Sequence, residues 1–194
     1  MNVYDFDKTI YPRDSTVDFY LTQLRKNPLL CRFWPRQLFG FAGYYVFHAF
    51  DKTVMKSHFY SYLKGVRNIE QEVESFWDTH IHLIKNFYLQ NHREDDLIIS
   101  ASASFLINAA CRRLGITSVL ASDVDPHTGE VLSPNCHGQE KVERMQQAGY
   151  PLDIEQFYSD SLNDTPLARL ARESYLVRGN KIEPWPNYDR VVRK

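Results

Sequence analysis

The stretch Val3-Tyr4-Asp5-Phe6-Asp7-Lys8-Thr9 opens a chain of 194 residues and decides how its remainder is interpreted. Val3 and Tyr4 are typical of a buried strand, and Asp5 and Asp7 follow where that strand would end. Residues two apart at a strand end project the same way, so these carboxylates share one small space. Like charges this close are costly unless one is protonated or a cation joins them. The pattern therefore indicates a catalytic site, with a helix cap beside a solvated acid as the alternative.

Further apolar runs with the character of strands alternate with helical patterns from about Leu97 onward. The expected strands are residues 2–6, 97–100, 118–121, 155–159 and 175–177. The expected helices are residues 104–114, 139–148 and 165–173. This alternation predicts an α/β fold built on a doubly wound, parallel sheet. Residues 123–132 are the exception, because turn residues between Asp125 and Gly129 predict a hairpin at the sheet edge.

Residues 15–92 have a different texture, since their apolar residues recur at helical spacing. We find no internal repeat and no Gly/Ser linker in the sequence. The predicted organisation is therefore an α/β core of residues 1–14 and 93–194, interrupted by a helical insertion of residues 15–92.

A second acidic cluster, Asp160-Ser-Leu-Asn-Asp164, follows the strand expected at residues 155–159. The carboxyl ends of parallel strands meet at one edge of a sheet, so these acids should converge with Asp5 and Asp7. Four acids at one point require a hard cation, and oxygen ligands of this kind suit Mg²⁺. Alternatively, residues 160–164 cap the helix expected from residue 165, a role that is compatible with catalysis.

Two other residues have the chemistry to bind an anion. Ser100 ends the strand expected at residues 97–100, and a hydroxyl with free backbone N–H groups at a helix start binds anions. Lys141 opens the helix expected at residues 139–148 and supplies a positive charge for a transferring phosphoryl group. Taken singly, such a serine is more often a helix cap and such a lysine is more often solvated.

The chain resembles the haloacid dehalogenase superfamily, whose four ordered motifs match Asp5-x-Asp7-x-Thr9, Ser100, Lys141 and Asp160-Ser-Leu-Asn-Asp164. The helical insertion is similar to the cap of the phosphoserine-phosphatase-like branch. The resemblance implies a Rossmann-like, doubly wound core with an inserted α-helical cap. It also implies a Mg²⁺-dependent phosphatase that acts through an aspartyl-phosphate. Lys8 departs from the family pattern, because many relatives carry Gly or Ser at this position. This difference bears on the turnover rate and not on the class of reaction.

The resemblance also implies a role for each motif residue. Asp5 would be the nucleophile, and Asp7 would be the general acid and base. The rest of the implied catalytic set is Ser100, Lys141 and Asp164. Mg²⁺ would be held by Asp5, Asp160 and the backbone carbonyl of Asp7. The residues implied in substrate binding are Thr9, Asp14, Ser100, Ala101, Lys141 and Asn163.

The composition of the insertion bears on the substrate. Between Phe19 and Arg67 there are 13 of the chain's 27 aromatic residues, and 8 basic residues against the single acid Asp51, a net charge of 8 − 1 = +7. Such aromatics can form the cap's own core, with the cations solvated. Alternatively, the cap contacts an anionic membrane surface or a phosphorylated lipid headgroup. We expect a small soluble phosphomonoester, with a lipid-headgroup phosphate or a non-catalytic phospholigand-binding role as alternatives.

Global properties narrow the class further. The net charge of −1 argues against a strongly basic nucleic-acid binder. The odd count of three cysteines cannot complete a disulfide framework, which favours a reducing cytoplasm. The first residues leave no room for a signal peptide, and the apolar residues 38–50 are fewer than the ~20 that span a bilayer. Adjacent Cys136 and His137 lack a second ligand pair, which argues against zinc.

Overall fold

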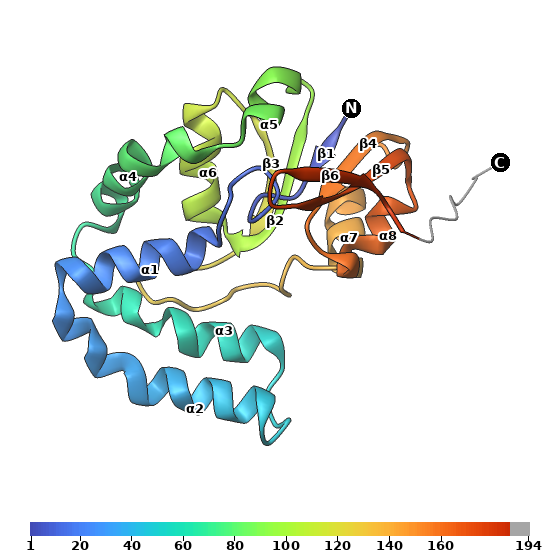
Figure 1. Cartoon of the computed structure of the whole chain (residues 1–194). Coiled ribbons are helices and arrows are strands. Elements are labelled where there is room, and N and C mark those ends of the chain that lie inside the picture. The colour runs from blue at the N-terminus through green and yellow to red at the C-terminus, as the bar shows by residue number, and fades with distance from the viewer. Residues whose placement is uncertain (187–194) are drawn as a thin grey trace.

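A computed structural model of the chain describes residues 1–186, so residues 187–194 of the predicted core segment lie outside the described part. The described residues form one six-stranded sheet of order β3-β2-β1-β4-β5-β6, and of these strands only β6 is antiparallel to its neighbour (Figure 1). The strands are β1 Val3–Tyr4, β2 Leu97–Ala103, β3 Ser118–Ser122, β4 Ile154–Ser159, β5 Ala171–Arg178 and β6 Lys181–Pro184. The predicted α/β class with a mainly parallel sheet is confirmed.

Helices fill the long connection between β1 and β2 and the later strand connections. The α-helices are α1 Ser15–Lys26, α2 Trp34–Tyr45, α3 Lys52–Tyr60, α4 Ile69–His80, α5 Asn86–Asn91, α6 Ser104–Arg113, α7 Gln139–Gln147 and α8 Thr165–Ala168. Short 3₁₀ turns are η1 Pro28–Phe33, η2 Ser61–Gly65, η3 Ile81–Leu83 and η4 Leu162–Asp164.

Alternation along the central strands directs side chains to two separate hydrophobic clusters. Val3 of β1 joins the cluster that α7 and α8 cover, whereas its neighbour Tyr4 joins the cluster that α4 and α6 cover. Leu97 and Ile98 of β2 divide in the same way. Successive strand residues face opposite sides of a sheet, so apolar residues at every position produce two buried faces. The sheet is therefore doubly wound, as the sequence predicted.

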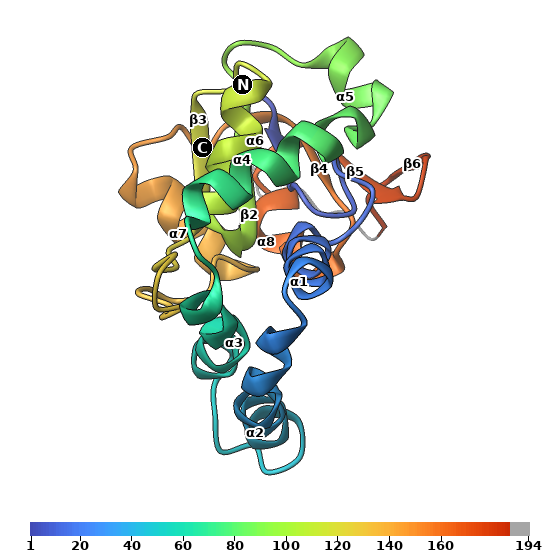
Figure 2. The ribbon, with the colours of Figure 1, turned by 90° about the vertical axis from the view of Figure 1, so that its left-hand side faces the viewer.

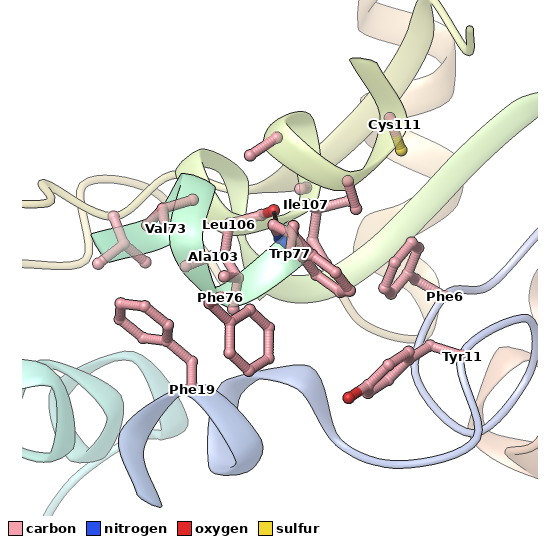
Figure 3. Packing of buried hydrophobic residues seen from close by; sticks show 14 of the residues in the cluster. Phe6, Tyr11, Phe19, Val73, Phe76, Trp77, Ala103, Leu106, Ile107 and Cys111 are labelled. Atoms are coloured by element: carbon pink, nitrogen blue, oxygen red, sulfur yellow. Dashed lines mark hydrogen bonds between the residues drawn. The ribbon is translucent and has the colours of Figure 1, made fainter. Parts of the chain in front are cut away.

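The cluster under α4 also fixes the loop that follows β1 (Figure 3). The indole of Trp77 packs edge-on against Phe6 and Tyr11, with ring centroids 5.8 and 5.4 Å apart. Its Nε1 donates a hydrogen bond of 2.8 Å to the carbonyl of Leu106 in α6. Through Trp77, these contacts tie the first motif to α4 within the long connection and to α6 after β2.

Helices α2 and α3 project from this body, and α2 is the outermost element in both views (Figures 1 and 2). Helices α4 and α5 instead contribute Trp77 and Tyr88 to the cluster beside the sheet. The division into a core of residues 1–14 and 93–194 and a cap of residues 15–92 stays a prediction. Within residues 1–186, no helix is both long and apolar enough to cross a bilayer.

Several predicted boundaries are wrong, because β1 is shorter than expected, β2 and β5 are longer, and the helix after β4 is much shorter. The helix expected at residues 165–173 ends at Ala168, and residues from Ala171 onward form β5. Parallel pairing with β4, including Ile154 with Ala171 and Gln156 with Glu173, determines this change. Helix propensity in such a short segment is weak beside the burial and hydrogen bonding of a sheet. The hairpin expected at residues 123–132 is present and is closed by the antiparallel bridge of Val124 with Val131.

The loop after β1 holds Lys8 in the left-handed backbone region, with φ of 59°. Its N–H donates to the carbonyl of Arg13 over 3.0 Å, and its own carbonyl accepts from Nζ of Lys85 over 2.7 Å. Lys85 is buried and donates a second bond of 2.7 Å to the carbonyl of Gly179. These bonds hold a conformation that costs a non-glycine residue roughly 1–2 kcal/mol.

Separate replacements of Lys8 by Gly and by Ala should distinguish backbone strain from charge. Both remove the ammonium, but only Gly removes the steric conflict of the left-handed region. We expect the Gly variant to have a free energy of unfolding about 1 kcal/mol higher than that of the Ala variant. Urea denaturation followed by circular dichroism measures this difference, and equal stabilities would show that Lys8 is not strained.

Candidate active site

A cavity of about 490 Å³ opens where β1, β2 and β4 end, beneath α2 and α3. This is the point at which the strand order reverses beside β1, the usual ligand position in open α/β sheets. The predicted site residues that line it are Asp5, Asp7, Asp14, Ser100, Ala101, Lys141, Asp160 and Asp164. The structure therefore brings together residues from all four motifs.

A buried lysine joins two of these motifs. Lys141, which is 1% exposed, places Nζ 2.6 Å from Oδ1 of Asp5 and 2.8 Å from Oδ2 of Asp164. Asp164 also accepts hydrogen bonds from Oγ of Ser159 over 2.8 Å and from the backbone N–H of Gly138 over 3.2 Å. The ammonium thus links the ends of β1 and β4 to the start of α7.

Burial and charge have opposing effects on the pKa values in this cluster. Burial alone would lower the pKa of Lys141, but Asp5 and Asp164 overcome that effect and raise it. Burial would raise the pKa of Asp164, but the charge and hydrogen bond of Lys141 lower it. For Asp5 burial prevails over Lys141, and its pKa rises to about 6. Lys141 is therefore a firmly charged partner for whatever anion shares this space.

Asp7 has a different set of partners. Its Oδ1 accepts from the backbone N–H of Ser15 over 2.9 Å, and its Oδ2 accepts from Oγ of Ser102 over 2.5 Å. Burial, and next the nearby charge of Asp14, raise the pKa of Asp7 to about 7. Ser102 lines the cavity and was not predicted as a site residue, although it follows Ser100 by two positions on the same strand. That spacing was the available signal for it.

Asp14 and Ser100 both line the cavity, but Ser100 lies within β2 and not at its end, because the strand continues to Ala103. The carboxylate of Asp14 caps α1 by accepting from the N–H of Val17 over 3.0 Å, and it also lines the cavity. Oγ of Ser100 accepts from the N–H of Ser102 over 3.1 Å. The two residues therefore border the cavity from α1 and β2.

Two predicted substrate contacts require correction, because Thr9 and Asn163 do not line the cavity. Thr9 is fully buried beneath Asp5 and donates to its Oδ2 over 3.2 Å, so it supports the carboxylate from behind. Asn163 is exposed on η4, whereas the next residue, Asp164, is directed inward to Lys141. In a short 3₁₀ turn, neighbouring side chains point in different directions. The sequence motif alone does not show which of them faces the cavity.

The helices above the cavity contribute residues that sequence reasoning did not assign to the site. They are Thr16, Phe41, Tyr45, Lys52, Lys56, Phe59 and Tyr60, and His137 adds a further one from the loop before α7. The sequence feature that pointed to them in general was the basic and aromatic composition of the insertion. Which of them reach the cavity depends on how α2 and α3 pack, and composition does not determine that packing.

The donor set at the sheet edge suits a hard cation. Among residues 1–186, no group of three His, Cys, Asp or Glu side chains is arranged as a metal cluster. The predicted Mg²⁺ set, however, needs only the carboxylates of Asp5 and Asp160 with the carbonyl of Asp7, and all these donors are oxygens on one cavity. Burial raises the pKa of Asp160 against the opposing charge of Lys8. Mg²⁺ prefers one or two carboxylates together with waters and phosphate oxygens, so these residues fit it.

Comparison with known proteins defines the class. Residues 3–169 match the model of the haloacid dehalogenase-like hydrolases, and the chain belongs to that family. Over 113 residues it is 29% identical to a histidinol-phosphatase of Neisseria meningitidis, covering 50% of this chain and 51% of that protein. Over 108 residues it is 30% identical to a probable phosphatase of Mycobacterium tuberculosis, covering 52% of this chain and 34% of that protein. The match thus spans about half or less of each relative.

Solved structures share the fold. A Bordetella pertussis protein of unknown function has a TM-score of 0.68 at 22% identity, covering 90% of this chain and 87% of that one. A phosphoserine phosphohydrolase-like protein of Francisella tularensis has a TM-score of 0.52 at 15% identity, covering 90% and 86%. These similarities support the predicted fold.

Proposed function

We propose that this chain is a Mg²⁺-dependent phosphomonoester hydrolase that uses Asp5 as its nucleophile. The observation that carries the proposal is the Asp5 carboxylate, held by the buried ammonium of Lys141 at the end of β1 in a cavity that also contains Asp7. Family membership and the phosphatase names of the relatives support the same reaction class.

In the first step, a carboxylate oxygen of Asp5 forms a bond to phosphorus as the ester P–O bond breaks. The leaving oxygen takes a proton from Asp7 and departs as an alcohol. Lys141 and Ser100 contact the phosphoryl oxygens and stabilise the negative charge that they carry in the transition state. Asp164 keeps the ammonium of Lys141 in place through its 2.8 Å contact.

In the second step, water attacks phosphorus and transfers a proton to Asp7, while the Asp5–phosphorus bond breaks. Phosphate is released and both carboxyl groups regain their original protonation. Mg²⁺ held by Asp5, Asp160 and the Asp7 carbonyl would neutralise negative charge on the phosphoryl group.

Replacement of Asp5 by Asn tests the nucleophile while preserving the side-chain shape. We expect at least a roughly thousandfold loss of kcat on an aryl phosphate, since removal of a nucleophile abolishes its covalent step. Asp95 is exposed and lies just before the amino end of β2, away from the cavity. The control Asp95→Asn should therefore leave kcat unchanged. Chelation should abolish turnover, excess Mg²⁺ should restore it, and Ca²⁺ should inhibit. Undiminished hydrolysis by Asp5→Asn would contradict the assignment.

A chain of hydroxyl groups connects α3 to the proposed acid. Oγ1 of Thr16 donates to Oγ of Ser102 over 3.1 Å, and Ser102 donates to Asp7. Because the Thr16 proton is used in that bond, Tyr60 must be the donor in its 3.2 Å contact with Thr16. Tyr60 is the last residue of α3. Thr16 is therefore a positioning residue that aims Ser102 at Asp7.

Thr16→Val removes the hydroxyl at constant volume and should disorient Asp7. We expect kcat to fall about tenfold with KM unchanged, because acid–base transfer depends on geometry. Thr16→Ser should restore the rate. Thr22→Val, which removes a hydroxyl bonded to the carbonyl of Asp18 in the same helix, is the matched control. An unchanged kcat in Thr16→Val would contradict the positioning role.

Lys56 places a second cation beside the phosphoryl-binding segment. Its Nζ donates to the carbonyl of Ala101 over 2.6 Å and to Oδ1 of Asn135 over 2.5 Å, which leaves one N–H for the cavity that it lines. Burial, and next the charge of Lys52, lower the pKa of Lys56 to about 8. We propose that this ammonium contacts the bound phosphomonoester.

Lys56→Met should raise KM by roughly tenfold or more, since a charge-assisted hydrogen bond is lost. A lowered pKa means that the cation is lost as pH rises through about 8. The wild-type KM should therefore increase above that pH towards the value of the variant, whose KM stays flat. Lys64→Met removes an exposed charge outside the cavity and serves as control. Parallel pH profiles for wild type and Lys56→Met would refute the contact.

The proposed substrate is a small soluble phosphomonoester, and the cytoplasmic location expected from the cysteine count stays a prediction. A lipid-headgroup phosphate and a phospholigand-binding role without turnover are the alternatives. A panel of phosphomonoesters assayed with Mg²⁺ separates them, because binding without hydrolysis across the panel would favour the non-catalytic role.

A further inference from the structure

Helix α2 exposes large apolar side chains on one face. Trp34, Leu38, Phe41 and Tyr45 recur at intervals of four, three and four residues, which places them along one side of the helix. Each is at least 36% exposed. Among residues 1–186, eight of the fifteen exposed large apolar residues lie between residues 29 and 47. The interpretation that the aromatics serve only as the cap's own core is therefore wrong for α2.

The packing of α2 explains this exposure. Its buried residues are Gln37, Gly40 and Gly43, and a Cβ added to Gly40 would lie 2.4 Å from Cβ of His58 in α3. Helix α3 thus covers a face made of small and polar residues. Of the large apolar residues, Trp34 donates from Nε1 to the hydroxyl of Tyr20 in α1 over 2.9 Å, and Phe41 packs against Phe59 of α3. Leu38 is 65% exposed, on the outermost element of the molecule (Figures 1 and 2).

The same region concentrates positive charge. Residues 19–67 carry 8 basic residues against Asp51, a net charge of +7, and Asp51 caps α3 through the N–H of Val54. Lys26 is paired with Glu72. Within the described part of the chain, the basic residues of this segment that are exposed and lack a carboxylate partner are Arg25, Arg32, Arg36, Lys64 and Arg67.

We propose that the apolar face of α2 docks on the surface of a bilayer that contains anionic phospholipids. An interfacial helix combines an apolar face that enters the headgroup region with cations that attract acidic lipids, and this segment has both. A second copy docking through the same region would bring the exposed, unpaired cations of one copy near those of the other, which opposes association. Acidic lipid is the partner whose charge complements the surface.

Docking would also set the direction in which the cavity opens. Phe41 and Tyr45 belong to the exposed face and line the cavity that contains Asp5. Its mouth would then lie at the level of the lipid headgroups. The inference rests on the proposed function only in that a phosphomonoester would enter the cavity. Docking of the helix on a bilayer requires no catalysis.

Sedimentation of the full chain with vesicles tests the proposal. Vesicles of pure phosphatidylcholine are compared with an equal mixture of phosphatidylcholine and phosphatidylglycerol at low and high salt. We expect binding to the mixed vesicles that weakens as salt rises, because surface attraction is screened over ~10 Å at 0.1 M salt. The Asp5→Asn protein should bind equally well, so a failed nucleophile assignment and failed docking are distinguishable.

Two independent variants probe the two components of the surface. Arg32→Gln with Arg36→Gln should weaken binding roughly 25-fold, about fivefold for each charge near the surface. Leu29→Gln with Leu38→Gln and Phe47→Gln should weaken it more than tenfold. All five positions are exposed and outside the cavity, so hydrolysis of a soluble aryl phosphate should persist.

Matched control variants replace the same types of residue, cations and exposed leucines, at positions away from α2. Arg178→Gln with Lys181→Gln removes two charges from the β5–β6 hairpin, and Leu89→Gln with Leu132→Gln alters exposed leucines away from α2. Neither should change vesicle binding. Failure of the wild type to sediment with mixed vesicles at low salt would overturn the proposal, as would equal losses in variants and controls. A dimer in light scattering that the Leu29, Leu38 and Phe47 changes abolish would assign the face to self-association instead.

Discussion

The buried ammonium of Lys141 is the interaction on which the candidate site depends. An isolated charge in a protein interior is strongly unfavourable, and it is tolerated here because Asp5 and Asp164 lie within 2.8 Å of Nζ. Removing one partner from such a cluster typically costs about 3–5 kcal/mol, since the remaining charge stays buried. The start of α7, the end of β1 and the turn after β4 must therefore adopt one mutual arrangement. That arrangement defines one wall of the cavity.

The sequence predicted those residues whose positions follow from strand topology. Parallel strands end at one sheet edge, so acids placed directly after β1 and β4 had to meet whatever the details of packing. The same reasoning did not extend to single side chains within turns, and it misplaced Asn163 and Thr9 relative to the cavity. Nor did it locate the end of α8, because pairing of β5 with β4 outweighs the local helical preference of residues 169–173.

The sequence did not predict which residues of the helical connection line the cavity, and the reason here is different. Lys56 and Tyr60 reach the cavity only because α3 is held against the core by contacts distant in sequence. The N–H of Val131 donates to Oγ of Ser57 over 3.0 Å. At Gly129, a Cβ would lie 2.2 Å from the carbonyl oxygen of Tyr60, so the hairpin approaches the helix more closely than a larger residue permits. No pattern within residues 52–60 encodes these contacts.

The two faces of α2 differ in which residues they bury and which they expose. The 12-residue helix α2 buries one stripe, and that stripe contains two glycines rather than the large apolar residues. Burying Leu38 and Phe47 would stabilise the fold by roughly 1.5–3 kcal/mol each, yet they are 65% and 72% exposed. Folding stability therefore does not explain their type. The exposed cations of this region would oppose the association of two copies that such a patch otherwise promotes. An apolar face joined to uncompensated cations is instead what contact with an acidic lipid surface requires, and this face borders the cavity that holds Asp5.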